Sequence, residues 1–121
     1  MASLILLPSA SAEVVNKPVD IEPTVEQVIA SYDWDYDIAY AVMIAESHKR
    51  ESVVNPEWHY DAKGNPICQG SIGLFQIACI HDSPEKLKDP EYNIKRAYDI
   101  YSEGGWRPWG VCHNGKVDCN L

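Results

Sequence analysis

The stretch Ile38-Ala39-Tyr40-Ala41-Val42-Met43-Ile44-Ala45, followed directly by Glu46, decides the fold of this chain. The run is apolar on every face of a helix, a pattern typical of a helix that lies in the middle of a core. The sequence therefore predicts a central helix from about Asp35 to Arg50, with Glu46 in its last turn. The other elements are expected to pack around it.

Glu46 is the carboxylate attached directly to this apolar helix. Burial disfavours the charged form of a carboxyl group, and the negative end of the helix dipole acts in the same direction, so we expect a raised pKa. A carboxyl group that stays protonated near neutral pH suits a general acid that protonates a glycosidic oxygen. The alternative, on helix geometry alone, is that Lys49 or Arg50 pairs with Glu46 at the surface.

Helix signals also lie on both sides of the central helix. Thr24 and Gln27 fit a capping box that starts a short helix through Ser31. Ser83-Pro84 and Asp89-Pro90 each place a capping side chain before a proline at the first helical position. The second pair is predicted to open a long helix, which the two glycines after Glu103 stop.

The segment between Glu51 and Gln69 has a different character. It is rich in Asn, Pro and Gly, which predicts a loop or a short irregular hairpin. The predicted fold class is therefore mostly α, or α+β at most: a helical domain with a small irregular or hairpin lobe.

The chain has 121 residues, 45% of them hydrophobic, which is the size of one domain. We expect this domain to span residues 24–121, preceded by a linker over residues 13–23. Residues 1–12 contain a short apolar run and end in Ala10-Ser11-Ala12. They are interpreted either as the remnant of a signal peptide or as a leader without targeting value.

The formal charge of -8 excludes some classes of partner. Without a cluster of Lys and Arg, the chain lacks the electrostatic signature of a nucleic-acid-binding protein. No stretch approaches the roughly 18 apolar residues of a membrane span. We expect a soluble monomer with no nucleic-acid partner and no membrane span.

The four cysteines form an even set without a C-x-x-C pair, which favours disulfides in an oxidising compartment over a zinc site. Cys112 and Cys119 bracket the turn signal Asn114-Gly115, and Cys68 and Cys79 flank the segment between them. We predict these two pairs among the three connectivities that four cysteines allow. The pairs favour export from the cytoplasm.

Other kinds of active site find little support. Ser47 and His48 are adjacent on the predicted helix, so their side chains diverge and cannot form a nucleophile and base pair. The four histidines lack metal-ligand spacing, and we expect them to be exposed to solvent. No metal and no cofactor is predicted.

Three motifs occur in order along the chain: Ala45-Glu46-Ser47, Ser71-Ile72-Gly73-Leu74-Phe75-Gln76-Ile77, and Asp89-Pro90-Glu91-Tyr92-Asn93-Ile94. Together they resemble the soluble lytic transglycosylase and goose-type lysozyme superfamily, over about residues 38–109. The resemblance implies a lysozyme-like fold and cleavage of peptidoglycan glycan strands between N-acetylmuramic acid and N-acetylglucosamine. It also implies that Glu46 is the catalytic acid and that Gln76 lines the cleft.

The substrate-binding candidates come from these motifs and from the helix and tail after them: Ser47, Ser71, Gly73, Phe75, Gln76, Asn93, Tyr98 and Trp106. Gly73 would let backbone approach a sugar, and Gln76 could bind an acetamido group. Phe75 could equally serve the core, and Ser71 could contact substrate or cap a turn. Trp109 is expected to pack in the core, whereas Trp106 could pack or stack on a sugar ring.

Most glycosidases use two carboxylates. Glu57, Asp61 and Asp82 lie in expected loops and match no family motif, so we predict a single-glutamate route in which Glu46 acts first as acid and then as base. The substrate's 2-acetamido group would stabilise the cation. A 1,6-anhydro product and a hydrolysed product both remain open, although the Ala-Tyr-Asn-Ala-Gly segment of larger transglycosylases is missing.

The alternative to an enzyme is a non-catalytic module that binds peptidoglycan or that takes part in the assembly of an envelope or a phage particle. In either case the expected location is the bacterial cell envelope, the exterior or a phage particle. The catalytic role of Glu46 separates the two hypotheses.

Overall fold

The computed structural model describes residues 21–121. The predicted signal-peptide remnant and most of the predicted linker lie outside these residues. The described elements, in chain order, are α2 (Val25–Ala30), α3 (Tyr36–Ser47), β2 (Val54–Tyr60), β3 (Pro66–Ile72), β4 (Ile77–Ala78), α4 (Pro84–Leu87), α5 (Pro90–Gly104) and the 3-10 turn η2 (Gly110–Cys112). The fold class is mostly α with a small antiparallel sheet, as predicted.

Helix α3 begins where Asp35 accepts a hydrogen bond from the Ile38 amide, and its inner face is buried in the core. It ends at Ser47, because His48 adopts a left-handed conformation with φ 53° and Lys49 follows at φ 64°. The prediction that this helix continues to Arg50 is therefore wrong by three residues. Its early end leaves Glu46 in the last turn.

The helices on either side of α3 begin at the predicted caps. Thr24 and Gln27 form the complete capping box of α2. Asp89 accepts from the Tyr92 amide at the start of α5, and Gly105 ends that helix with φ 67°. Ser83 precedes α4 but makes no side-chain cap, so Pro84 is the feature that marks this start.

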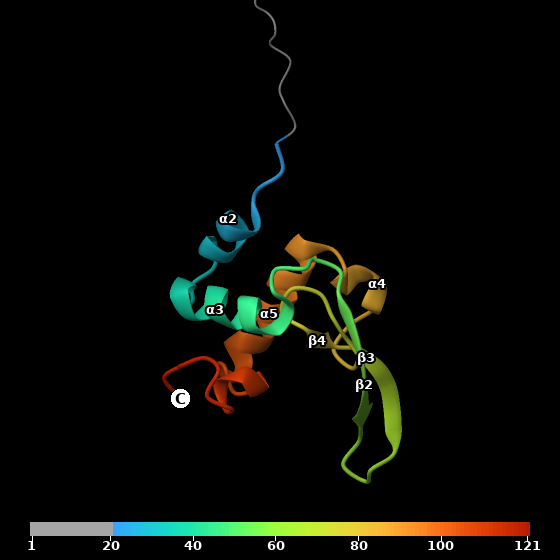
Figure 1. The fold of residues 1–121 in the computed structure, drawn as a ribbon. Coiled ribbons are helices and arrows are strands. Elements are labelled where there is room, and N and C mark those ends of the chain that lie inside the picture. Colours follow the sequence, from blue (N-terminus) through green and yellow to red (C-terminus); the bar gives the residue numbers. More distant parts are fainter. Residues whose placement is uncertain (1–20) are drawn as a thin grey trace, which may run out of the picture.

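Strands β2, β3 and β4 form one antiparallel sheet in that order. Asn55 pairs with Ser71 and Trp58 with Gln69, and between these two pairs the register of β2 shifts. The β2–β3 hairpin extends away from the helices (Figure 1). Of the two structures predicted for this region, the hairpin is the one that forms.

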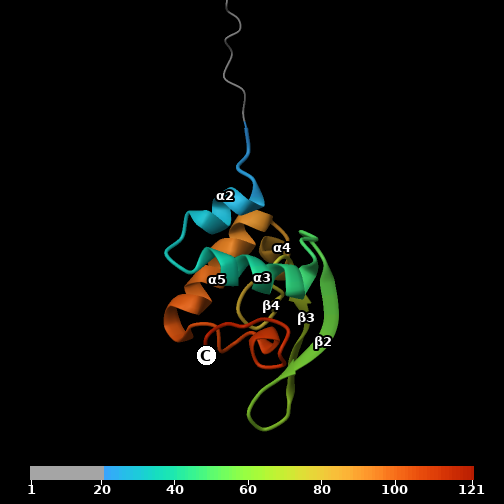
Figure 2. The ribbon, with the colours of Figure 1, turned by 60° about the vertical axis from the view of Figure 1, so that its left-hand side comes forward.

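The hydrophobic core lies between α2, α3, α5 and the sheet, and the C-terminal segment runs back beside α3 (Figure 2). Disulfides join Cys68 to Cys79 and Cys112 to Cys119, the pairing that the sequence predicts. The first connects β3 to the residue after β4, and the second closes the C-terminal segment. Among the described residues, no helix combines the length and the hydropathy that a membrane crossing would need.

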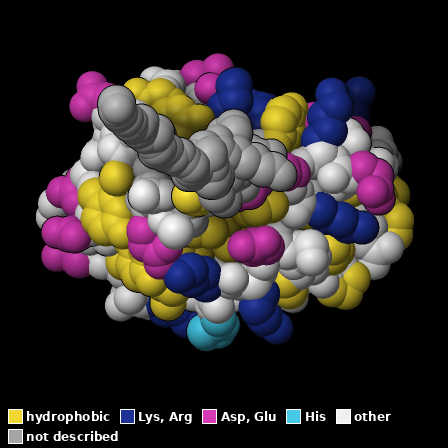
Figure 3. All heavy atoms as spheres, turned by 90° about the horizontal axis from the view of Figure 1, so that it is seen from above, with side chains coloured by type: hydrophobic (Ala, Val, Ile, Leu, Met, Phe, Trp, Pro, Cys, Tyr) yellow, Lys and Arg dark blue, Asp and Glu magenta, His cyan; other side chains and the backbone are white. Residues whose placement is uncertain are grey.

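Charged side chains of both signs are interspersed on the face shown in Figure 3, with apolar side chains between them. The ion pairs of the described residues are mostly exposed, such as Lys95 with Asp99 on one turn of α5. Exposed pairs of this kind contribute little to stability, so the core and the disulfides hold the fold.

Candidate active site

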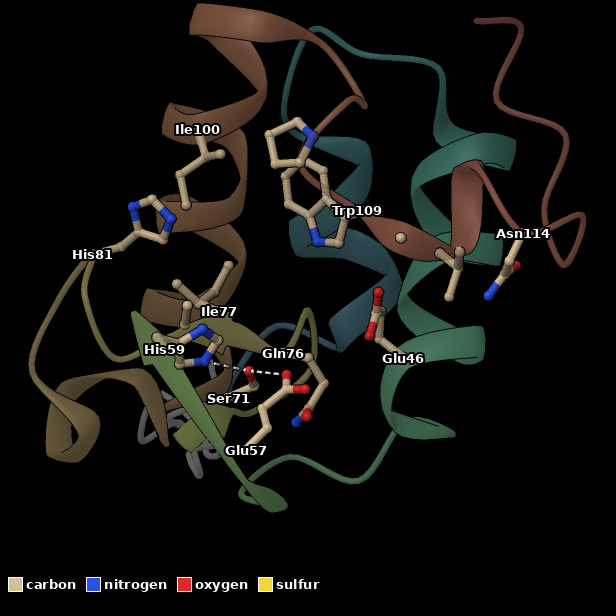
Figure 4. A pocket seen from close by; sticks show the side chains of 14 residues that line it. Glu46, Glu57, His59, Ser71, Gln76, Ile77, His81, Ile100, Trp109 and Asn114 are labelled. Atoms are coloured by element: carbon tan, nitrogen blue, oxygen red, sulfur yellow. Dashed lines mark hydrogen bonds between the residues drawn. The ribbon is translucent and has the colours of Figure 1, made fainter. Parts of the chain in front are cut away.

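A cavity of about 320 Å³ lies between the end of α3, the hairpin and the C-terminal segment. Its walls carry most of the polar groups that the sequence motifs single out and several that they do not (Figure 4). The lining residues that bear on its chemistry are Glu46, Glu57, His59, Ser71, Gln76, Trp109 and Asn114.

Glu46 is half-buried at the end of α3, and its carboxyl group faces the cavity (Figure 4). Burial raises its pKa to about 7; the negative charge of Glu57 acts in the same direction, and the positive charge of Lys116 opposes both. Burial is therefore the main cause, as the sequence predicts. The carboxyl group is in part protonated at neutral pH.

The alternative in which a cation of the same helix end pairs with Glu46 is wrong. Lys49 pairs with Glu26 of α2, 23 residues away in sequence. Arg50 turns back, and its Nε donates to the Ser47 carbonyl oxygen at 2.9 Å. Both side chains are directed elsewhere because the chain leaves the helix at His48.

Gln76 lines the cavity beside Glu46, with a backbone φ of 50°. Its Nε2 donates to the carbonyl oxygens of Val53 at 3.2 Å and Gly73 at 3.1 Å, and its Oε1 accepts from Asn55 Nδ2 at 2.5 Å. Both amide hydrogens are thus used within the protein. What Gln76 can still offer to a ligand is one lone pair, so it can accept but not donate.

Trp109 forms part of the cavity wall, although the sequence favoured a packing role for it. The ring is 5% exposed, and its Nε1 donates to the Phe75 carbonyl oxygen at 3.0 Å. This bond fixes the indole against the segment that carries Gln76. Trp109 therefore packs in the core and presents one part of its surface to the cavity.

Asn93 is fully buried and holds the segment before Gln76 in place. Its Oδ1 accepts from the Phe75 amide at 2.9 Å, and its Nδ2 donates to the carbonyl oxygens of Ile72 at 2.9 Å and Leu87 at 2.8 Å. Gly73 lies directly against this amide, with φ 79°, and an added Cβ would meet Asn93 Nδ2. The predicted sugar contacts of Asn93 and Gly73 are thus corrected: their close approach is to each other.

A family model described as a lysozyme-like domain matches residues 30–111, which is more than half of the chain. The chain belongs to the lysozyme-like domain family. No curated protein and no solved structure matches it. The family match confirms the resemblance seen in the three motifs and the lysozyme-like fold class.

Four other candidates from the sequence lie away from the cavity of this lysozyme-like domain. Ser47 is buried and donates to the Met43 carbonyl oxygen at 3.1 Å, and Phe75 is fully buried. Tyr98 and Trp106 belong to an aromatic cluster around Trp34, with ring centroids 5.3 and 5.4 Å from that indole. Their positions assign them to packing because their rings are occupied by one another.

Two cavity residues of the lysozyme-like domain, Glu57 and His59, were not among the candidates from the sequence. Both lie on β2, two positions apart, and therefore on one side of the strand. His59 is half-buried and hydrogen-bonded, which corrects the expectation that the histidines are exposed. The Glu-x-His alternation was the available signal, and the Asn-Pro pair before it obscured the strand.

Ser71 is also placed differently from both alternatives that the sequence left open. It is 3% exposed on β3, and its hydroxyl donates to Glu57 Oε2 at 2.7 Å. It therefore anchors a neighbouring side chain of the cavity instead of capping a turn. Direct contact with substrate stays a prediction.

Proposed function

We propose that this lysozyme-like domain cleaves peptidoglycan glycan strands between N-acetylmuramic acid and N-acetylglucosamine, with Glu46 as the catalytic acid. Membership of the family supports a glycosidase that acts on peptidoglycan. The observation that carries the proposal is the Glu46 carboxyl group, which faces a cavity and whose pKa burial raises to about 7.

The first step is proton transfer to the glycosidic oxygen. A protonated carboxyl group with a pKa near the working pH combines a high acid fraction with a good driving force for donation. As Glu46 gives its proton, the bond between C1 and the leaving oxygen breaks, and the electron pair goes to that oxygen. Positive charge then develops at C1.

Substrate positioning would come from the walls around Glu46. The remaining lone pair of Gln76 Oε1 suits the N–H of a 2-acetamido group, and the exposed part of the Trp109 ring suits the apolar face of a sugar. Asn114, from the C-terminal segment, adds an amide at the far wall.

The second step admits two products. In the single-glutamate route, the Glu46 carboxylate removes a proton from the muramoyl 6-hydroxyl, which gives the anhydro sugar, or from water, which gives a reducing end. Both share the acid step.

We further propose that the protein acts outside the cytoplasm, in the cell envelope, the exterior or a phage particle. The two disulfides suit an oxidising compartment, and peptidoglycan is located there.

The test is a zymogram on purified peptidoglycan with the Glu46→Gln variant, which keeps the shape of the side chain and removes its acid function. We expect loss of lytic activity by about 100-fold or more, the range of general acid catalysis. Glu51→Gln is the matched control, because Glu51 is exposed and lies outside the cavity.

Two results would contradict the proposal. Unchanged lysis by Glu46→Gln would remove the catalytic assignment. A wild-type protein that binds sacculi without cutting them would support the non-catalytic module instead.

A further inference from the structure

The cavity contains a second carboxylate that no motif predicts. Glu57 comes from strand β2 and Glu46 from helix α3, and both side chains border the same space (Figure 4). Among the described residues, no hydrogen bond joins the two carboxyl groups, although the charge of one acts on the other. They therefore approach the cavity separately and do not share one proton.

Glu57 is held by a chain of two further side chains. The Ser71 hydroxyl lies 2.7 Å from Glu57 Oε2, and His59 Nε2 lies 3.2 Å from the same hydroxyl. His59 Nε2 is also 3.1 Å from the Gly70 carbonyl oxygen. Ser71 is buried, and all three residues belong to the paired strands β2 and β3.

The Gly70 carbonyl fixes the direction of this chain. A carbonyl oxygen can only accept, so the His59 Nε2 beside it carries a hydrogen. That N–H also faces the oxygen of Ser71, which leaves the single hydroxyl hydrogen of Ser71 for Glu57. Oε2 of Glu57 is therefore an acceptor, as in a carboxylate.

The other oxygen of Glu57 is left for a molecule in the cavity. Within residues 21–121, the Ser71 hydroxyl supplies the hydrogen bond that Glu57 receives, and it is received on Oε2. Oε1 can then accept from water. A carboxylate fixed at one oxygen and open at the other is suited to remove a proton from a water molecule.

We propose that Glu57 is a second catalytic residue, the base that activates water, with Ser71 and His59 as positioning residues, so that cleavage ends in hydrolysis. This inference rests on the proposed function and replaces the second half of the single-glutamate route.

The atoms balance as follows. Glu46 gives a proton to the leaving oxygen, the C1–O bond breaks, and its electron pair goes to that oxygen. Water oxygen bonds to C1 on the opposite face while its proton passes to Glu57 Oε1, which inverts C1. One water molecule is consumed, and exchange with solvent restores both carboxyl groups.

The product of the wild-type protein gives the first test. We expect mass spectrometry of digested sacculi to show muropeptides that are one water molecule heavier than the anhydro form, and NMR to show inverted configuration at C1. An anhydro product, or retention at C1, would overturn the assignment of Glu57 as the base. Cleavage itself would still support Glu46 as the acid, so the two proposals fail separately.

The second test is the Glu57→Ala variant with sodium azide. Loss of the base should lower kcat by about 100-fold or more. Azide attacks C1 without needing deprotonation, so it should restore turnover and yield a glycosyl azide with inverted configuration. Full activity of Glu57→Ala without azide would overturn the inference. Circular dichroism checks the fold, and Glu51→Gln is again the control.

The positioning chain is tested with a matched pair at one position. His59→Leu removes the N–H donor, whereas His59→Gln keeps a donor of similar reach. We expect His59→Leu to lower kcat with KM unchanged and His59→Gln to retain most of the activity. Equal kinetics for the two variants would contradict the role assigned to this hydrogen bond.

Discussion

Glu46 combines two properties that a single side chain seldom has: it is partly withdrawn from water and it still borders open space. The first follows from its attachment to α3, whose preceding turns are in the core, and the second from the end of that helix one residue later. Two charges tune it from other elements, Glu57 from β2 and Lys116 from the C-terminal segment. The acid function is therefore set by burial first and by these two neighbours second.

The pH dependence of cleavage follows from the raised pKa of Glu46, about 7. The protonated form is the active acid, and its fraction falls as pH rises through this value. We expect kcat/KM to decline above about pH 7, by roughly tenfold for each further unit of pH. A pH series with a soluble glycan fragment measures this limb.

Lys116→Met provides the control for that series. The Lys116 charge lowers the pKa of Glu46, so its removal should move the alkaline limb to higher pH. A limb that shifts to lower pH, or a rate that stays constant to pH 9, would show that another group controls the reaction.

At the scale of elements, the segment between β3 and β4 is the part that shapes the cavity. Asn93 of α5 bonds to Ile72, Phe75 and Leu87, and this cross-link fixes the turn that presents Gln76. Gly73 is required inside the turn because both its φ of 79° and its contact with the Asn93 amide exclude a side chain.

Gly73→Ala should therefore destabilise the domain severely. The new Cβ would lie against Asn93 Nδ2 and 2.5 Å from the Leu87 carbonyl oxygen, in a left-handed backbone conformation. We expect a loss of about 3 kcal/mol of unfolding free energy, combining overpacking and backbone strain. Urea denaturation followed by tryptophan fluorescence measures it.

Gly104→Ala is the matched control for this substitution. Gly104 belongs to helix α5, and nothing lies within 4 Å of an added Cβ. An alanine in a helix is favoured over glycine, so this variant should be as stable as the wild type or more stable. If both variants lost the same stability, the packing argument for Gly73 would be wrong.

At the scale of the whole molecule, the cavity exists only because distant parts of the chain meet. Its walls come from α3, the hairpin, β4, α5 and the C-terminal segment. The family match ends at residue 111, so the disulfide-closed segment that carries Asn114 lies beyond it. This segment completes one wall and places the Lys116 charge near Glu46.

Removal of the Cys112–Cys119 disulfide should thus affect both stability and activity. Replacing the two cysteines by serine frees a short loop in the unfolded chain, which costs about 2–3 kcal/mol of unfolding free energy. We also expect a higher KM, since the wall that carries Asn114 loosens. Denaturation midpoints and lysis kinetics, with and without a reducing agent, measure the two effects.

The comparison with the wild type under reducing conditions identifies the cause. A reducing agent should lower the midpoint of the wild type more than that of the double variant, because the latter has one disulfide left to lose. Equal midpoints for the oxidised wild type and the double variant would show that this bond adds no stability.

The sequence by itself determined the features that depend on neighbouring residues. The caps at Thr24, Asp35 and Asp89 are local hydrogen bonds, and the apolar run before Glu46 is a local periodicity, so both could be predicted without any distant partner. The same holds for the family motifs and for Glu46 as the acid candidate. The short loop that Cys112 and Cys119 close is also a local feature.

Only the tertiary structure decided which polar groups share the cavity. The β2–β3 register, shifted after Asn55, sets the side of the strand that Glu57 and His59 occupy, and no local pattern encodes such a shift. Likewise, Asn93 became a buried cross-link and Trp109 a wall residue through contacts with segments far away in sequence. Pairing across the fold, not residue type, separates a side chain that faces the substrate from one that supports the core.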